Sequence, residues 1–108
     1  MLSLTLPLML GACQTDSGPH AEAKALIASQ CAACHIVPGV RTAVGRTGPT
    51  LDGIAKRQLI AGRFPNNRDV LVRWLMHPQA MVPGTAMPEV GLNETQAIAV
   101  AKYLETLN

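Results

Sequence analysis

Cys31-Ala32-Ala33-Cys34-His35 is the stretch of sequence that decides the fold. It ends an alanine-rich run that predicts a helix over residues 21–33, because alanine is the strongest helix former. Side chains three residues apart are neighbours on a helical turn. The thiols of Cys31 and Cys34 should therefore lie close together, with the imidazole of His35 directly after them.

The C-x-x-C-H spacing is the attachment sequence of c-type haem. Two thiols at this spacing can add across the two vinyl groups of one porphyrin, and the following imidazole is then positioned beneath the iron. We therefore expect one covalent haem c, attached through Cys31 and Cys34, with His35 as a ligand of the iron.

Three other uses of these cysteines fit less well. A structural zinc site needs about four ligands, and only two cysteines remain if Cys13 has a separate role at the N-terminus. A thioredoxin-like redox pair requires a βαβ context, whereas the chain shows no strand-like alternation. A plain disulfide between Cys31 and Cys34 is open to an exported protein, but it leaves His35 without a role.

The composition fits one globular domain that lacks large apolar side chains of its own. The chain has 108 residues, of which 48% are hydrophobic, and it contains one Phe, one Tyr and one Trp. A domain of this size has a modest core, so a buried macrocycle would supply much of the missing apolar surface.

Positive charge gathers in the middle third of the chain. The net charge of +2, with no basic run among aromatic residues, argues against a nucleic-acid partner. The basic residues of this third either steer an acidic partner or are solvated loop side chains, and both interpretations stay open. They are Arg41, Arg46, Lys56, Arg57, Arg63, Arg68 and Arg73, opposed there by Asp52 and Asp69.

Two further helices are predicted, so the fold class is all-α with three main helices. One begins near Asn67, a plausible N-cap, and ends before Pro78. The last has Asn93 as N-cap and Gln96 three residues later, close to a capping box. The intervening segments 36–66 and 79–92 are long for loops, with at most one short helix over 51–57. We expect each of them to cover one face of a flat cofactor.

Met87 is the predicted second iron ligand. It lies in Pro83-Gly84-Thr85-Ala86-Met87-Pro88, where the prolines stiffen the backbone. A thioether opposite a histidine raises the reduction potential and suits an electron carrier. Core filling is the ordinary role of a methionine. Met81 and His77 are the competing ligands, and His20 is expected to be solvated.

The N-terminus resembles the lipobox of bacterial lipoproteins. An apolar run over residues 1–10 leads into Leu10-Gly11-Ala12-Cys13, and it is too short to span a bilayer. The resemblance implies a signal peptide over 1–12, lipid on Cys13, a tether over 13–20 and a folded domain over 21–108, on the periplasmic side of a bacterial membrane. No Lys or Arg precedes the apolar run, which departs from a signal peptide. The alternative is a buried segment with Cys13 in the core.

Residues 21–108 resemble a class I (monohaem) c-type cytochrome, most closely the cytochrome c domain fused to subunit II of bacterial haem-copper oxidases. Gly48-Pro49-Thr50-Leu51 matches the Gly-Pro-x-Leu loop of that family. The resemblance implies that the Pro49 carbonyl accepts a hydrogen bond from His35, and that Leu51 belongs to the haem site. It also implies that Arg57 lies near a haem propionate and that Trp74 donates its indole N–H there, although Trp74 is nearly as well explained by core packing.

The family also implies that the first and last helices cross at close contact. The matching positions are Ala23 and Ile27 on the first helix, and Val100 and Tyr103 on the last. This chain departs from the usual Gly and aromatic residue on the first helix, so the crossing is expected to be packed differently.

The function implied by the resemblance is that of a membrane-anchored single-electron carrier rather than an enzyme. Its expected partners are a terminal oxidase, a quinol-oxidising complex or a dehydrogenase. Two alternatives stay open. One is a haem sensor or peroxidase with an open or labile sixth site, and the other is a fixed cytochrome subunit of a membrane dehydrogenase.

Overall fold

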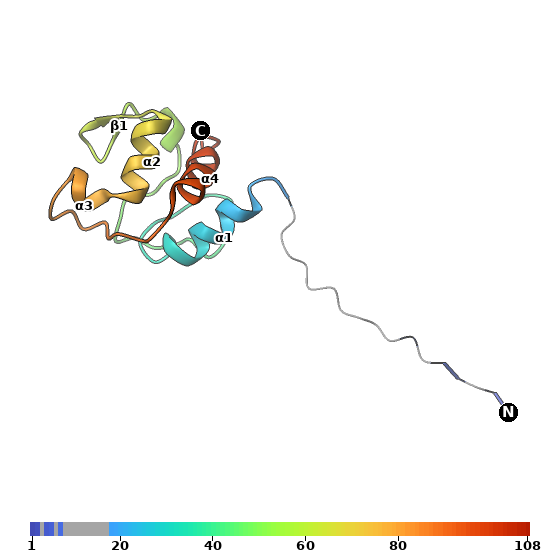
Figure 1. Cartoon of the computed structure of the whole chain (residues 1–108). Coiled ribbons are helices and arrows are strands. Elements are labelled where there is room, and N and C mark those ends of the chain that lie inside the picture. The colour runs from blue at the N-terminus through green and yellow to red at the C-terminus, as the bar shows by residue number, and fades with distance from the viewer. Residues whose placement is uncertain (3, 6, 8–17) are drawn as a thin grey trace.

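The computed structural model describes residues 1, 2, 4, 5, 7 and 18–108, so the predicted lipidation site Cys13 lies outside the described residues. Four α-helices, one short 3₁₀ helix and a two-stranded hairpin follow one another along the chain (Figure 1). In order they are α1 (Ala21–Gln30), η1 (Ile54–Lys56), β1 (Leu59–Ile60), β2 (Phe64–Pro65), α2 (Arg68–Met76), α3 (Pro78–Met81) and α4 (Glu94–Leu104).

The all-α prediction is confirmed, with α1, α2 and α4 as the three main helices. The starts of two of them follow from side-chain caps. Asn67 accepts a hydrogen bond from the backbone N–H of Val70 at the start of α2. Asn93 and Gln96 form the complete capping box of α4, in which each side chain bonds the backbone N–H of the other residue.

In three places the structure differs from the local predictions or adds to them. The helix expected over 21–33 ends at Gln30, because the chain tightens there into the turn of the cysteine motif. Pro78 does not only end α2 but also opens α3 at its first position, where a missing N–H costs nothing. The antiparallel pair Leu59↔Pro65 and Ile60↔Phe64 was not expected, since strands of two residues are too short to show alternation.

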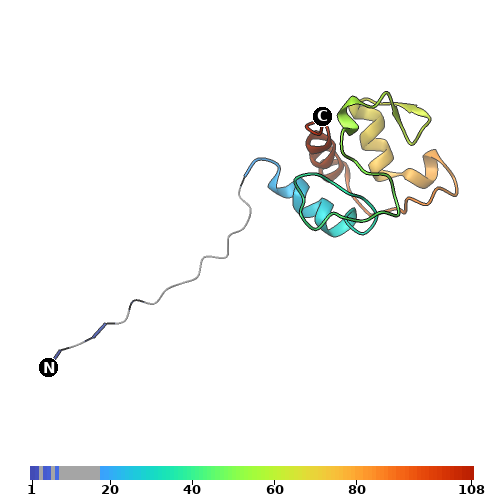
Figure 2. The same cartoon turned by 180° about the vertical axis from the view of Figure 1, so that it is seen from behind.

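Helix α4 packs against both α1 and α2 (Figures 1 and 2). All four residues expected at the crossing of the first and last helices are buried. The buried side chains of the three helices are Ala23 and Ile27 on α1, Leu71 and Leu75 on α2, and Ala97, Val100, Ala101, Tyr103 and Leu104 on α4. Small alanines on both sides let the backbones of α1 and α4 approach closely.

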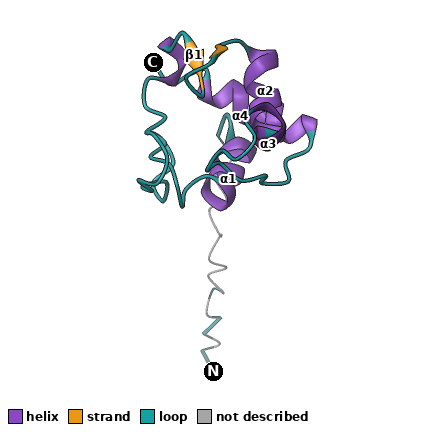
Figure 3. Cartoon of the chain, turned by 90° about the vertical axis from the view of Figure 1, so that its left-hand side faces the viewer, coloured by secondary structure: helices purple, strands orange, loops and turns teal. Residues whose placement is uncertain are grey.

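The long loop between α1 and η1 (residues 31–53) lies on one side of the domain, and most of the helices lie on the other (Figure 3). Tyr103 fastens α4 to this loop, because its hydroxyl donates a hydrogen bond of 2.5 Å to the Pro38 carbonyl. Burial raises the pKa of Tyr103, which keeps the hydroxyl protonated as a donor. Gly39 next to this bond has φ +83°, and a Cβ there would collide with the Tyr103 hydroxyl oxygen.

A second tie joins the beginning of α2 to the end of α4. Arg68 donates from Nε to Oε1 of Glu105 at 2.9 Å and from Nη2 to Oε2 at 2.5 Å. These hydrogen bonds hold the pKa of Glu105 below its usual range. The pair is exposed, so it orients the two helices more than it stabilises them. Among the described residues, no helix is long and apolar enough to cross a membrane.

We predict that Tyr103→Phe lowers the stability of the domain by about 1 kcal/mol, because the half-buried Pro38 carbonyl loses its donor while the ring is kept. For a domain of this size, the corresponding fall in melting temperature is roughly 4–8 °C. Thermal unfolding followed by circular dichroism measures it. An unchanged melting temperature would show that the hydrogen bond carries no stability.

Candidate functional site

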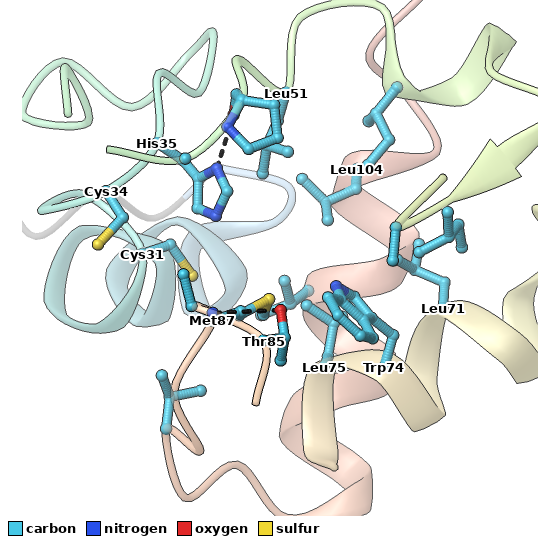
Figure 4. Close-up of a pocket in the computed structure, with 18 of the residues that line it drawn as sticks. Cys31, Cys34, His35, Leu51, Leu71, Trp74, Leu75, Thr85, Met87 and Leu104 are labelled. Carbon is cyan, nitrogen blue, oxygen red and sulfur yellow. Dashed lines mark hydrogen bonds between the residues drawn. The ribbon is translucent and has the colours of Figure 1, made fainter. Parts of the chain in front are cut away.

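A cavity of about 380 Å³ lies between the helices and the two long loops. Side chains from α1, α2 and α4 meet there with residues of both loops (Figure 4). Most of its wall is apolar, and these side chains include Ile27, Leu51, Ile54, Leu71, Leu75, Val90, Leu92, Val100 and Leu104. The cavity is therefore continuous with the hydrophobic core rather than a polar cleft on the surface.

The cysteine motif forms a turn that continues from the last residue of α1. The backbone N–H of Cys34 bonds the Cys31 carbonyl at 3.1 Å, and that of His35 bonds the same carbonyl at 3.0 Å. This turn brings Cys31, Cys34 and His35 to the cavity wall. Both cysteines are free thiols, so the structure does not contain the alternative disulfide.

Burial, with a smaller contribution from Cys34, raises the pKa of the Cys31 thiol to about 11. This thiol is therefore neutral at physiological pH, when nothing is attached to it. A neutral sulfur suits an apolar wall, because a buried thiolate would need a counter-charge.

The orientation of the His35 imidazole depends on one hydrogen bond and on the absence of a side chain at Gly48. Its Nδ1 lies 2.6 Å from the carbonyl oxygen of Pro49, which only accepts, so Nδ1 carries the proton. A Cβ on Gly48 would lie 2.5 Å from Cε1 of the ring, so only glycine leaves the ring its place. Nε2 is then the nitrogen with a free lone pair, and it has no hydrogen-bond partner among the described residues.

Met87 comes to the cavity from the second long loop and lies across from the ring of His35 (Figure 4). Imidazole nitrogen and thioether sulfur are both iron ligands in proteins. The competing ligands Met81 and His77 do not line the cavity. His77 is exposed instead, with Nδ1 at 3.8 Å from Oε2 of Glu89.

The structure also places the other predicted site residues at the cavity. Leu51 and Trp74 line it, and the indole of Trp74 lies beside Thr85 and Met87 (Figure 4). The indole N–H donates to no described residue, so it can donate to a bound group. Arg57 lines the cavity as well, with its guanidinium bonded to the carbonyls of Thr50 and Asp52.

The structure also shows polar contacts and site residues that the sequence did not indicate. His20, expected to be solvated, is exposed, and its ring also lies against Tyr103 with the ring centroids 5.5 Å apart. Arg63, which also lines the cavity, was not predicted as a site residue, although the basic excess of the middle third pointed to that segment. Gln79, which binds the backbone around Met87, carried no sequence signal at all.

The residues at this cavity fit a covalent haem c. Two free thiols and a tautomer-fixed imidazole stand at one side, a thioether at the other, apolar side chains line the space between, and arginines suit the propionates. A zinc site fits less well, since no three His, Cys, Asp or Glu side chains of the described part of the chain gather to hold a metal ion. Site and fold together define an all-α haem protein of the c type.

The cytochrome c family profile matches residues 20–108, and the chain belongs to that family. Its cofactor is therefore one covalent haem c, and family membership indicates an electron carrier. A relative that it matches over nearly full length is cytochrome c type-1 of Ascaris suum, 30% identical over 107 residues, which covers 85% of this chain and 91% of the relative.

Two bacterial relatives are named cytochrome c oxidase subunit 2. The protein of Bacillus sp. (strain PS3) is 36% identical over 90 residues, covering 80% of this chain and 25% of the relative. That of Alkalihalophilus pseudofirmus is 34% identical over 80 residues, covering 73% and 22%. The chain spans about a quarter of the length of these two relatives. The predicted resemblance to the cytochrome c domain fused to subunit II is confirmed.

We predict that Gly48→Ala shifts the absorption spectrum of the haem-containing protein, because the new Cβ displaces the His35 ring from Pro49. Such overpacking should also cost about 1–3 kcal/mol of stability. Gly62→Ala is the control, since Gly62 has a positive φ but no atom within 4 Å of the place a methyl group would take. It should lose about 1–2 kcal/mol with no spectral change. A Gly48→Ala spectrum identical to wild type would disprove the steric argument.

Proposed function

We propose that this protein is a single-electron carrier whose haem c would be held through thioethers by Cys31 and Cys34, with His35 and Met87 as the residues that would bind the iron. The observation that carries the proposal is the arrangement of one apolar cavity. The imidazole of His35, whose tautomer is fixed, lies on one side of it and the thioether of Met87 on the other, and Cys31 and Cys34 also line it.

A bound haem c supplies one-electron exchange between Fe(II) and Fe(III). The chain's own residues do the rest. Pro49 keeps the proton of His35 on Nδ1, so that Nε2 stays available as a ligand. With haem bound, the Met87 thioether would occupy the position that a substrate would need and would raise the reduction potential. The apolar walls exclude water, so the environment changes little when one electron arrives or leaves.

Met87 decides between a carrier and a ligand-binding haem protein. We predict that the wild-type protein is low-spin in both oxidation states and binds CO slowly, because the thioether closes the sixth position. Met87→Ala should bind CO readily, acquire peroxidase activity and show a lower potential, since the thioether no longer favours Fe(II). CO-binding kinetics and redox titration of the purified protein measure these changes.

Met81→Ala is the matched control, because Met81 does not line the cavity and its loss should leave all three properties unchanged. Rapid CO binding by the wild type would favour the sensor or peroxidase alternative. A Met87→Ala protein that behaves like the wild type would remove Met87 from the iron.

We further propose that Cys13 is lipidated and that the lipid holds the haem domain at the periplasmic face of a bacterial membrane. Support comes from the apolar run over residues 1–10 and the small residues before Cys13.

The relatives named cytochrome c oxidase subunit 2 favour a terminal oxidase as the acceptor. A quinol-oxidising complex or a dehydrogenase is then the donor. The exposed arginines of the middle third would steer such partners.

We predict that Cys13→Ser converts a membrane-bound protein into a soluble periplasmic one with an unchanged haem spectrum. One acyl chain binds membranes only marginally, so stable anchoring needs at least two chains. Fractionation of cells and the intact mass of detergent-extracted protein test this. An N-terminus that extends upstream of Cys13 and carries no lipid would contradict the proposal, and the electron-carrier role would be unaffected.

A further inference from the structure

The side chain of Gln79 makes three hydrogen bonds to the backbone of the Met87 loop. Its Nε2 donates to the carbonyl of Thr85 at 2.7 Å and to the carbonyl of Met87 at 2.9 Å. Its Oε1 accepts from the backbone N–H of Gly84 at 3.2 Å. A flipped amide would oppose its oxygen to two carbonyl oxygens, so only this orientation satisfies all three partners.

The loop has few other means of holding its shape. Residues 82–93 contain no helix or strand. Within residues 84–87, the other hydrogen bonds to described residues run from the Thr85 N–H to the Val82 carbonyl at 3.0 Å and from the Met87 N–H to the Thr85 hydroxyl at 3.5 Å. Neither of them engages the carbonyl of Met87. Gln79 is therefore the described side chain that holds the carbonyl of Met87.

Gln79 is held in place by its neighbour in the chain. Pro78, at the first position of α3, is almost completely buried, with a relative exposure below 2%. Proline fixes its own φ, so the backbone that carries Gln79 has little freedom. The amide thus connects a buried anchor point to the part of the loop that presents the thioether.

We propose that Gln79 is a positioning residue for the distal ligand: its three hydrogen bonds hold the thioether of Met87 at the cavity and set how often the position opposite His35 opens. The proposal rests on the proposed ligation by Met87. A methionine side chain has three rotatable bonds and adapts to many shapes, so it defines a position only when its backbone is held. Gln79 supplies that restraint, and its loss releases the loop and the ligand with it.

The test is the rate at which imidazole, at a fixed concentration, binds to the oxidised haem-containing protein. Imidazole can bind only when the thioether has left, so the rate reports the fraction of open loop. Gln79→Leu keeps the side-chain volume and removes all three hydrogen bonds, and we expect imidazole binding to accelerate about tenfold.

Gln79→Glu keeps the hydrogen bond from the Gly84 N–H and loses both donors, so it should accelerate imidazole binding at neutral pH. Below the pKa of the new carboxyl group, one donor returns and the rate should fall again.

Gln96→Leu is the matched control. It also removes a glutamine that bonds backbone, in the capping box of α4, and it should lower stability without changing the imidazole rate. If Gln79→Leu does not fold, Gln79→Glu decides the question. Wild-type rates in the Gln79 variants, beside rapid binding in Met87→Ala, would overturn the role of Gln79 and leave Met87 as ligand. Equal rates in Met87→Ala and wild type would overturn both.

Discussion

The hydrogen bond from Nδ1 of His35 to the Pro49 carbonyl, 2.6 Å long, is the interaction on which the site depends. It decides which nitrogen carries a proton and which one faces the cavity. A backbone hydrogen bond supports this contact. The Gly48 N–H donates to the Cys34 carbonyl at 2.7 Å and holds the loop that carries Pro49 next to the cysteine motif. A side chain on Gly48 would occupy the place of the ring. The loop thus closes around an imidazole whose orientation it also sets.

The cavity wall and the hydrophobic core share residues. Leu71, Leu75 and Leu104 belong to the buried cluster of the helices, and they also line the cavity. A group bound there contacts side chains of three helices at once. Its apolar contacts with these side chains therefore add to the stability of the fold. This coupling explains how a chain with one Phe, one Tyr and one Trp can form a stable domain.

The parts of the structure that could be predicted are those that depend on residues close together in the sequence. The spacing of Cys31, Cys34 and His35 is such a part, and so are the side-chain caps of α2 and α4. The β1–β2 hairpin is too short for periodicity to reveal it. Gln79 escaped prediction because its role depends on a loop that returns to it five to eight residues later. A glutamine in isolation predicts only a polar side chain.

The two sides of the cavity are restrained in different ways, and the difference assigns each side its role. His35 lies directly after Cys34, so its position follows from the turn that carries the attachment point. Met87 reaches the cavity from a loop held by a few hydrogen bonds, and each such bond is worth about 1 kcal/mol. A small ligand competes only for the fraction of molecules in which this loop is open. Whether the protein acts as a carrier or as a ligand-binding haem protein therefore depends on the free energy of loop closure as well as on the chemical identity of the ligand.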